Sequence, residues 1–458
     1  MGTEVARLRT GARPGARTAR TPPIHLPAAS ASRAVPTVPE AARPPAPTRG
    51  TIIRTPLRRP RTRTATLLST TTVLGLLLTG TGATAATAAD APAASASPVV
   101  PSPIAPFDPA VLDAPYPSNA VYDFVPMLDA FTALKATRPD IMKMNDRKTI
   151  TINQAATKAQ SARAIVDQYA DMSITMSDGL GRDLGAIYRT AREAGQLPKT
   201  AALLAKSGGL VGRYSSSNPP KQHFDNPRPY VAFPLMLKYR DKVGGNAWNG
   251  QDGSYPSGHT SQAFWQGTSL ATMLPELAPQ ILARASDASN NRIIMGAHYP
   301  LDVMAGRMMG QKIVERRWSD PEFRTLFEQA STELRTVLEA KCGAALAVCI
   351  AKDKPYLPTA QALAVYEQRM SYGFPVVGNR GEPMTVPTGA ESLLISSHPD
   401  LTPEQRRQVL ALTAIDSGEP LDAGTEGSWQ RIDLAAAMAA RVVITADGTV
   451  SLVATGRR

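Results

Sequence analysis

Three short stretches of the chain concentrate cationic side chains, histidines and one aspartate. They read KQHFDNPRP from Lys221, PSGH from Pro256 and NRIIMGAHYPLD from Asn291. The chain has only five histidines, so two of them in these stretches require an explanation. Together the stretches supply three side chains that are positive at neutral pH, two histidines and one carboxylate: Lys221, Arg228, Arg292, His259, His298 and Asp302.

The cations of these stretches are suited to binding a phosphate group. Three positive charges match the three non-bridging oxygens of a phosphate ester, and an arginine offers a planar fork to two of them. Ser257 and Gly258 precede a predicted helix, whose first turn has free N–H groups and the positive end of the helix dipole. Gly258 lets the backbone approach a ligand closely. These residues therefore predict an anion site.

The two histidines supply the groups that cleavage of a phosphate ester needs, a nucleophile and a proton donor. Asp302 follows His298 by four residues, and Pro300 is suited to the first turn of a helix. This spacing lets the carboxylate of Asp302 reach back to the imidazole, where it would fix the tautomer and raise the basicity of the ring. The combined pattern predicts phosphoryl transfer.

The order and spacing of the stretches resemble the signature of the type 2 phosphatidic acid phosphatase superfamily: Lys-x(6)-Arg-Pro, Pro-Ser-Gly-His and Arg-x(5)-His-x(3)-Asp. Within it, SYPSGHTS and the short spacings are most similar to the bacterial class A non-specific acid phosphatases, whose fold the vanadium haloperoxidases share. The resemblance covers roughly residues 125–340. It implies an all-α helical bundle of the acid phosphatase/vanadium haloperoxidase type.

The resemblance also implies a role for each residue. His298 is the expected nucleophile, which forms a phosphohistidine; Asp302 orients it, and His259 protonates the leaving alcohol and then activates water. The expected phosphate ligands are Lys221, Arg228, Ser257, Gly258, Arg292 and, where the family usually has serine, Asn291. The asparagine amide is longer than serine and carries an acceptor, so its place in the site is open. No metal or cofactor is expected, and vanadate is expected to bind as a phosphate mimic.

The N-terminal region differs from the rest of the chain. The first 106 residues contain no Phe, Trp or Tyr, and residues 1–63 carry thirteen arginines and two glutamates, a charge of +11 out of the +12 of the whole chain. A basic stretch, an apolar run near residues 67–78 and small residues then follow in the order of a secretory signal. We predict a basic leader with a signal peptide over 1–88, a linker over 89–106 and an exported protein. The alternative is an uncleaved anchor.

Helical patterns dominate residues 107–355, the predicted phosphatase domain, near 152–172, 182–194, 197–206, 259–274, 277–292, 300–317 and 321–341. Residues 356–458 form a predicted C-terminal extension of mixed α/β structure and unknown role, with helices near 359–371, 403–413 and 431–441. Asp447-Gly448 joins two β-prone runs, which predicts a hairpin. Cys342 and Cys349 are predicted to form a local disulfide, because thiols of exported proteins oxidise.

The sequence thus predicts an exported acid phosphatase that hydrolyses small-molecule phosphomonoesters, with no nucleic-acid partner and no membrane insertion after signal cleavage; a homo-oligomer remains open. An acidic optimum is expected, because the proton donor must be an imidazolium. Two alternatives remain: a vanadate-dependent haloperoxidase, and a non-catalytic phosphate-binding or cell-surface protein that relies on the C-terminal extension. A membrane-embedded lipid phosphatase is disfavoured, because no apolar span of about 20 residues follows residue 90.

Overall fold

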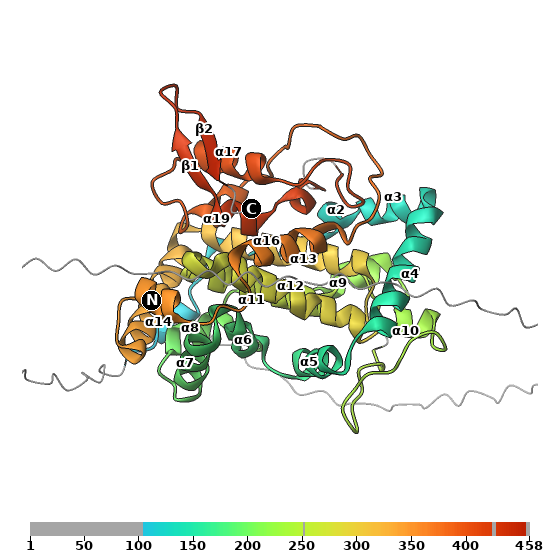
Figure 1. The fold of residues 1–458 in the computed structure, drawn as a ribbon, viewed down its shortest axis with the longest axis horizontal. Helices are drawn as coiled ribbons and strands as arrows, with labels where there is room; N and C mark the ends of the chain where they lie inside the picture. The colour runs from blue at the N-terminus through green and yellow to red at the C-terminus, as the bar shows by residue number, and fades with distance from the viewer. Residues whose placement is uncertain (1–103, 251, 424–426, 455–458) are drawn as a thin grey trace, which may run out of the picture. The chain divides into compact units, whose positions relative to one another are not determined.

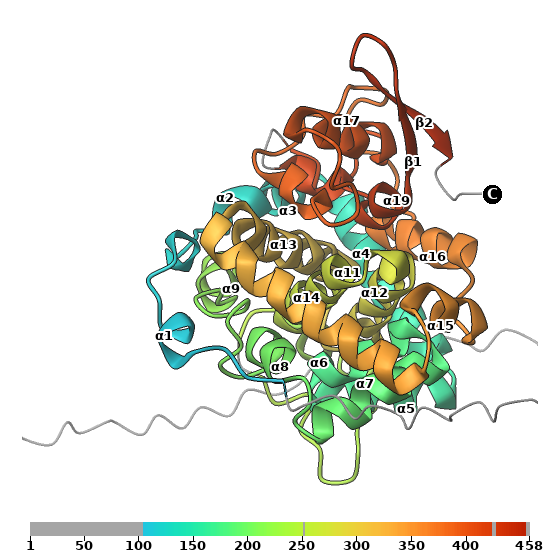
Figure 2. The ribbon, with the colours of Figure 1, turned by 90° about the vertical axis from the view of Figure 1, so that its left-hand side faces the viewer.

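The computed structural model describes residues 104–250, 252–423 and 427–454, which belong to one predominantly helical unit. Three long helices pack together at its centre: α11 (Gly258–Met273), α12 (Ala278–Ile294) and α13 (Pro300–Ser319) (Figure 1). A fourth, α14 (Pro321–Cys342), lies against α11 and α13 (Figure 2). The prediction of an all-α bundle is confirmed. The three stretches that begin at Lys221, Pro256 and Asn291 are called the first, second and third motifs below. The second motif leads into α11, and the third spans the junction of α12 and α13.

Other helices surround these four, and most of them share one hydrophobic core with them. A second, smaller cluster consists of Ala164, Ala247, Ile294, Met295 and Ala297. Before α11 the surrounding helices are α1 (Pro109–Leu112), α2 (Val125–Leu128), α3 (Ala130–Thr137), α4 (Pro139–Ala155), α5 (Lys158–Tyr169), α6 (Met172–Thr175), α7 (Arg182–Glu193), α8 (Pro198–Leu204), α9 (Asn218–Phe224) and α10 (Pro229–Ala232). After α14 they are α15 (Leu346–Lys352), α16 (Thr359–Ser371), α17 (Pro403–Thr413) and α19 (Leu434–Ala439). Short 3₁₀ turns lie at Pro117–Asn119, Met176–Leu180, Pro275–Leu277, Ala390–Leu394 and Ser428–Arg431.

The predicted helix over 152–172 is wrong in its boundaries, because the helical structure is interrupted between the end of α4 at Ala155 and the start of α5 at Lys158. Thr157 caps α5: its Oγ accepts the N–H of Gln160 at 3.2 Å, and Gln160 Oε1 accepts the N–H of Thr157 at 2.9 Å. This capping box starts a new helix, although the apolar periodicity of the sequence continues across the interruption. The other helices predicted between residues 182 and 341 agree with the structure within two residues at each end.

Glycines bring α11 and α13 close to each other. A Cβ atom at Gly306 would lie 2.6 Å from the carbonyl oxygen of Ser257, and one at Gly310 would lie 2.7 Å from that of Ser261. Only glycine permits such an approach. The N–H of Ser257 also donates to the carbonyl oxygen of Asp302 at 3.0 Å. The N-terminus of α11 is therefore fixed beside the N-terminus of α13, and these two turns carry the second motif and the end of the third.

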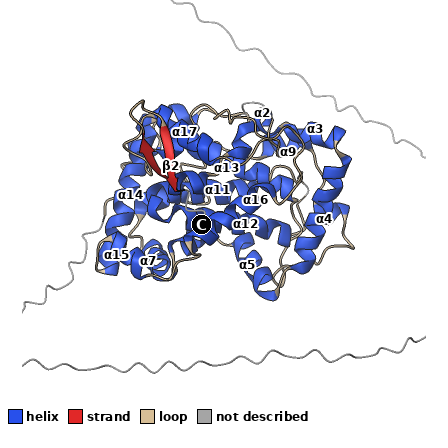
Figure 3. Cartoon of the chain, turned by 45° about the horizontal axis from the view of Figure 1, so that its top comes forward, coloured by secondary structure: helices blue, strands red, loops and turns tan. Residues whose placement is uncertain are grey.

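The C-terminal residues pack against the bundle, since α16 and α19 both contact α12. The predicted hairpin is present: β1 (Arg441–Ile444) pairs with β2 (Val450–Ala454) in antiparallel register, with Ile444 opposite Val450 (Figure 3). Gly448 adopts a φ of 84° in the turn, as a glycine readily does. The helix predicted over 431–441 is shorter, because α19 ends at Ala439 and the chain continues as β1.

Cys342 and Cys349 form the expected disulfide, with an S–S distance of 2.08 Å. The bond ties the end of α14 to α15. In the part of the chain that the structure describes, no helix is both long and apolar enough to cross a membrane. The predicted leader, signal peptide and most of the linker lie outside the described residues.

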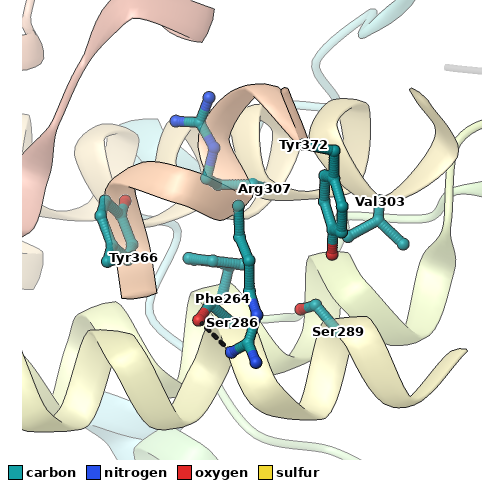
Figure 4. A pocket seen from close by; sticks show the side chains of 8 residues that line it. Phe264, Ser286, Ser289, Val303, Arg307, Tyr366 and Tyr372 are labelled. Carbon is teal, nitrogen blue, oxygen red and sulfur yellow. Dashed lines mark hydrogen bonds between the residues drawn. The ribbon is translucent and has the colours of Figure 1, made fainter. Parts of the chain in front are cut away.

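A small cavity of about 10 Å³ lies where α16 meets α11, α12 and α13. Phe264, Ser286, Ser289 and Arg307 are among its lining residues (Figure 4). Arg369 donates to Ser286 Oγ at 2.9 Å. The volume is that of about one water molecule. None of the motif residues lines it, so this cavity belongs to the packing of the bundle.

Candidate active site

The three motifs come from separate elements and meet where α11 and α13 begin and α12 ends. From the first motif, Lys221 lies on α9 and Arg228 directly precedes α10. In the second, Ser257 caps α11 and His259 lies in its first turn. In the third, Arg292 lies in the last turn of α12, His298 lies in the loop that follows, and Asp302 lies in the first turn of α13.

His298 and Asp302 are both buried and contact each other. Nδ1 of His298 lies 3.2 Å from Oδ2 of Asp302, and the same oxygen accepts the N–H of Tyr299 at 2.9 Å. Asp302 can reach back because Pro300 begins the helix two residues earlier. Burial raises the pKa of Asp302 to about 7, although hydrogen bonds from Tyr299 and Ser254 lower it. The carboxylate therefore holds the Nδ1 edge of the imidazole.

The other ring nitrogen of His298 faces a guanidinium. Nη1 of Arg228 lies 3.1 Å from Nε2 of His298 and donates to the carbonyl oxygen of Ala297 at 3.1 Å. A guanidinium has no acceptor, so Nε2 must accept and the ring proton lies on Nδ1, towards Asp302. Burial, followed by the charges of Arg228 and Lys221, lowers the pKa of His298 well below its usual value. The ring is thus neutral, with the lone pair of Nε2 directed at the guanidinium of Arg228.

Lys221 and Arg228 share a carboxylate that lies outside the three predicted motifs. Nζ of Lys221 lies 2.5 Å from Oδ2 of Asp252, and Nη2 of Arg228 lies 2.7 Å from Oδ1. Burial and then the charge of Arg228 lower the pKa of Lys221. Although partial burial raises the pKa of Asp252, its hydrogen bonds to the two cations lower it to about 2. Asp252 is therefore an anion throughout the physiological range of pH.

His259 is half-buried, and its pKa is lowered well below the usual value. The charge of Arg292 is the largest cause, followed by burial and the charge of Lys206, while a hydrogen bond to the backbone of Gln168 acts in the opposite direction. A histidine whose pKa is lowered is protonated only at more acidic pH. Any function that requires His259 as an imidazolium is therefore favoured by acid or by an anion bound beside the ring.

Ser257 and Gly258 form the start of α11. The Oγ of Ser257 accepts the N–H of Thr260 at 3.3 Å, so the serine caps the helix. A Cβ atom at Gly258 would lie 2.6 Å from the Oγ of Ser217 and 3.9 Å from Cε of Lys221. A side chain at this position would have to displace the hydroxyl of Ser217, and the contact with Lys221 places the backbone of Gly258 next to the first motif. The hydroxyl hydrogen of Ser257 is not consumed by the cap, so its role as a phosphate ligand stays a prediction.

Arg292 is buried, and Gln168 from α5 accepts a hydrogen bond from its Nη1. Burial, and then the charge of Arg228, lower the pKa of Arg292 to about 9, so the guanidinium is charged at neutral pH. Its neighbour Asn291 donates from Nδ2 to Oδ2 of Asp167 at 2.7 Å. The amide that stands in place of the family's serine is thus engaged with α5. Its second N–H as a phosphate ligand stays a prediction.

Two residues at the site lie outside the predicted set. Asp252 is the more important, because it contacts two of the three motif cations. The available signal is its position, a carboxylate five residues before Ser257 in a loop rich in glycine. Gln168 contacts Arg292 from a helix more than a hundred residues earlier in the chain, and the sequence carries no signal for that contact.

Within the described ranges, no group of three or more His, Cys, Asp or Glu side chains is arranged to hold a metal ion. The charged groups in contact with His298 are the guanidinium of Arg228 and the carboxylate of Asp302, and Asp252 in turn pairs with Arg228 and Lys221. This donor set is suited to binding an anion. Metal independence itself stays a prediction.

Comparison with known proteins agrees with this geometry. Residues 202–316 match the model of the PAP2 superfamily, and this range contains all three motifs. The chain therefore contains a PAP2 superfamily domain, and it is homologous, at moderate identity, to bacterial non-specific acid phosphatases. The resemblance inferred from the motifs is confirmed.

Three of these relatives illustrate the extent of the likeness. An acid phosphatase of Zymomonas mobilis is 30% identical over 179 residues, which cover 39% of this chain and 64% of the relative. A non-specific acid phosphatase of Salmonella typhi is 31% identical over 166 residues (36% and 63%), and one of Providencia stuartii is 28% identical over 147 residues (31% and 55%). The chain spans less than two thirds of the length of each of these relatives.

Proposed function

We propose that this protein is an exported phosphoric monoester hydrolase of the acid phosphatase type, which acts through a phosphohistidine and without a metal or other cofactor. One observation carries the proposal. A neutral, buried imidazole, His298, is held on its Nδ1 side by Asp302 and directs Nε2 at Arg228 of the first motif. The named activity of the homologous proteins supports it.

Binding of the substrate relies on charge. The phosphoryl oxygens of a monoester are received by Lys221, Arg228 and Arg292, together with the N–H of Gly258 and the hydroxyl of Ser257. Fixed cations in a largely buried site stabilise the charge that develops on the equatorial oxygens during transfer. Vanadate, which copies the shape and charge of phosphate, is expected to bind at the same position.

The chemical step begins when the lone pair of His298 Nε2 attacks phosphorus. The P–O bond to the alcohol breaks, its electron pair stays on the alcohol oxygen, and that oxygen takes a proton from His259. Asp302 stabilises the positive charge that forms on the ring of His298. In the second step His259 removes a proton from water, the water oxygen attacks phosphorus, and the P–N bond breaks to return the electron pair to Nε2.

Hydrolysis of p-nitrophenyl phosphate by the purified protein tests the proposal. We expect turnover between pH 4 and 8 that an excess of EDTA does not reduce, and competitive inhibition by vanadate. His298→Ala should lower kcat by at least about 10³-fold, because it removes the nucleophile. Absence of hydrolysis across this pH range would refute the phosphatase, and an active His298→Ala variant would refute the assignment of the nucleophile.

The same assay separates the two alternative functions. A vanadate-dependent haloperoxidase would brominate a dye in the presence of vanadate, bromide and peroxide, and it would leave the phosphate ester intact. A non-catalytic phosphate-binding or cell-surface protein would bind phosphate but turn over neither substrate. Mere binding does not require Asp302 to hold His298 as a neutral imidazole, so the geometry favours the phosphatase. Recovery of the mature protein from the culture medium or cell envelope tests export.

A further inference from the structure

Asp252 lies at the position where the two cations of the first motif meet. Its two carboxylate oxygens are divided between them, Oδ2 to Lys221 at 2.5 Å and Oδ1 to Arg228 at 2.7 Å. Its side chain is 48% exposed, while those of the lysine and arginine are 6% and 10% exposed. An accessible carboxylate therefore covers two nearly buried cations from the solvent side.

These contacts use the hydrogen-bond donors that a phosphoryl group would need. Besides Asp252, Nζ of Lys221 donates to the carbonyl oxygen of Gly253 at 2.8 Å. Arg228 donates from Nε to the carbonyl oxygen of Asp252, and its Nη1 faces the carbonyl oxygen of Ala297 and Nε2 of His298. The partner of its remaining nitrogen, Nη2, is Oδ1 of Asp252. A carboxylate and a phosphoryl group offer these donors the same kind of anionic oxygen. Both cannot occupy them fully at once.

Backbone hydrogen bonds at Gly250 and Ser254 flank Asp252, whereas its side chain adjoins open space. On one side Tyr230 donates from its hydroxyl to the carbonyl oxygen of Gly250 at 2.5 Å, and on the other the N–H of Ser254 donates to the carbonyl oxygen of Asn226 at 2.7 Å. An open cavity of about 550 Å³ adjoins Asp252 on this side. Rotation of this side chain would break both carboxylate contacts, that of Oδ2 with Lys221 and that of Oδ1 with Arg228, while the backbone contacts of the two cations remain.

We propose that Asp252 sets the affinity of the phosphate site: its carboxylate competes with the phosphoryl group for Lys221 and Arg228, and it thereby determines how tightly the site holds phosphate and phosphate esters. The proposal rests on the proposed function for its reference to substrate, although phosphate binding tests it without turnover. An anion must displace Asp252 from both cations to use them. This exchange lowers the affinity for every phosphate ligand, and it speeds release of the phosphate product.

The direct test is the affinity for inorganic phosphate, measured by isothermal titration calorimetry on the full chain. Asp252→Asn keeps the size of the side chain but removes its charge, and it should bind phosphate more tightly by on the order of tenfold, since two ion pairs no longer compete. The inhibition constant of phosphate against p-nitrophenyl phosphate, and the KM of that substrate, should fall in the same proportion.

The chain offers a matched control in Asp225, which lines the same cavity. Asp225 is exposed and forms no described ion pair with Lys221 or Arg228. Its left-handed backbone, with a φ of 38°, is tolerated by asparagine. Asp225→Asn therefore removes the same charge from the same cavity and should leave the affinity for phosphate unchanged. Asp252→Glu, which keeps the charge, should stay within a few-fold of the wild type.

Each outcome decides the proposal. Tighter binding by Asp252→Asn but not by Asp225→Asn supports it. Unchanged binding overturns it, as does weaker binding, which would make Asp252 a residue that positions the cations. If both variants bound phosphate more tightly by the same factor, the cause would be the lower negative charge of the cavity as a whole, which would also overturn the proposal. If Asp252→Asn does not fold, Asp252→Ser provides the same comparison. Absence of all turnover would refute the phosphatase while the calorimetric result still stands.

Discussion

Asp302→Asn tests how much the contact with His298 contributes to catalysis. The amide oxygen of asparagine can still accept from His298 Nδ1 and from the N–H of Tyr299, which lie 3.2 and 2.9 Å from the carboxylate oxygen that it replaces. The substitution therefore keeps the geometry and removes the negative charge. That charge stabilises the positive ring that forms when His298 attacks phosphorus, so kcat should fall.

The magnitude follows from the distance between the two groups. Two unit charges at 3.2 Å interact by about 5 kcal/mol at an effective dielectric constant of about 20, which sets an upper bound. A hydrogen bond to a charged group contributes about 1.5–3 kcal/mol. A loss of about 3 kcal/mol corresponds to a decrease in kcat of about 10²-fold.

The pH dependence sharpens this prediction. Burial raises the pKa of Asp302 to about 7, so in the free protein the negative charge is present above that pH and is lost as the pH falls through it. Since kcat/KM reports on the free enzyme, the ratio of wild type to Asp302→Asn should be larger at pH 8 than at pH 5. Steady-state hydrolysis of p-nitrophenyl phosphate at both values measures it.

A buried aspartate away from the site provides the control. Asp320 also accepts N–H groups in the first turn of a helix, those of Glu322 and Phe323, both at 3.2 Å. Asp320→Asn should lower the stability of the protein but leave kcat near that of the wild type. A folded Asp302→Asn variant with kcat/KM within fivefold of the wild type at pH 8 would refute the role assigned to Asp302.

Two further predictions follow from the surroundings of the site. The charge of Lys206 lowers the pKa of His259, so Lys206→Gln should raise that pKa and move the alkaline limb of kcat/KM to higher pH by a few tenths of a unit. Lys135 is an exposed lysine on α3, and Lys135→Gln should leave the limb unmoved. A limb that moves in neither variant would exclude His259 as the group that must be protonated. Asn291→Ala removes the donor to the buried carboxylate of Asp167 and should lower the free energy of unfolding in urea by about 1–3 kcal/mol, whereas a raised KM with unchanged stability would instead identify the amide as a phosphate ligand.

The local parts of the site were open to prediction from sequence because they depend on short spacings. Pro300 starts α13 and brings Asp302 within reach of His298, and Ser257 caps α11 as a serine before a helix does. These contacts form within one helical turn, so the chain order already contains them.

The remaining contacts depend on how distant segments pack. Asn291 meets Asp167 and Arg292 meets Gln168, in each case across 124 positions of sequence, because α5 lies against α12. The break that creates α5 is set by a capping box, which continuous apolar periodicity conceals. Asp252 binds its two cations from a loop without periodic structure. The spacing of residues in the sequence contains no information on any of these contacts.

The central claim is that phosphate is transferred to His298, and trapping of the intermediate tests it most directly. The protein is mixed with an excess of a ³²P-labelled phosphomonoester, quenched in alkali within milliseconds, digested and mapped, because phosphohistidine survives alkali and is hydrolysed by acid. We predict an acid-labile label on the peptide that contains His298, and no label in His298→Ala. Turnover without a labelled peptide, or a label on another residue, would contradict the account.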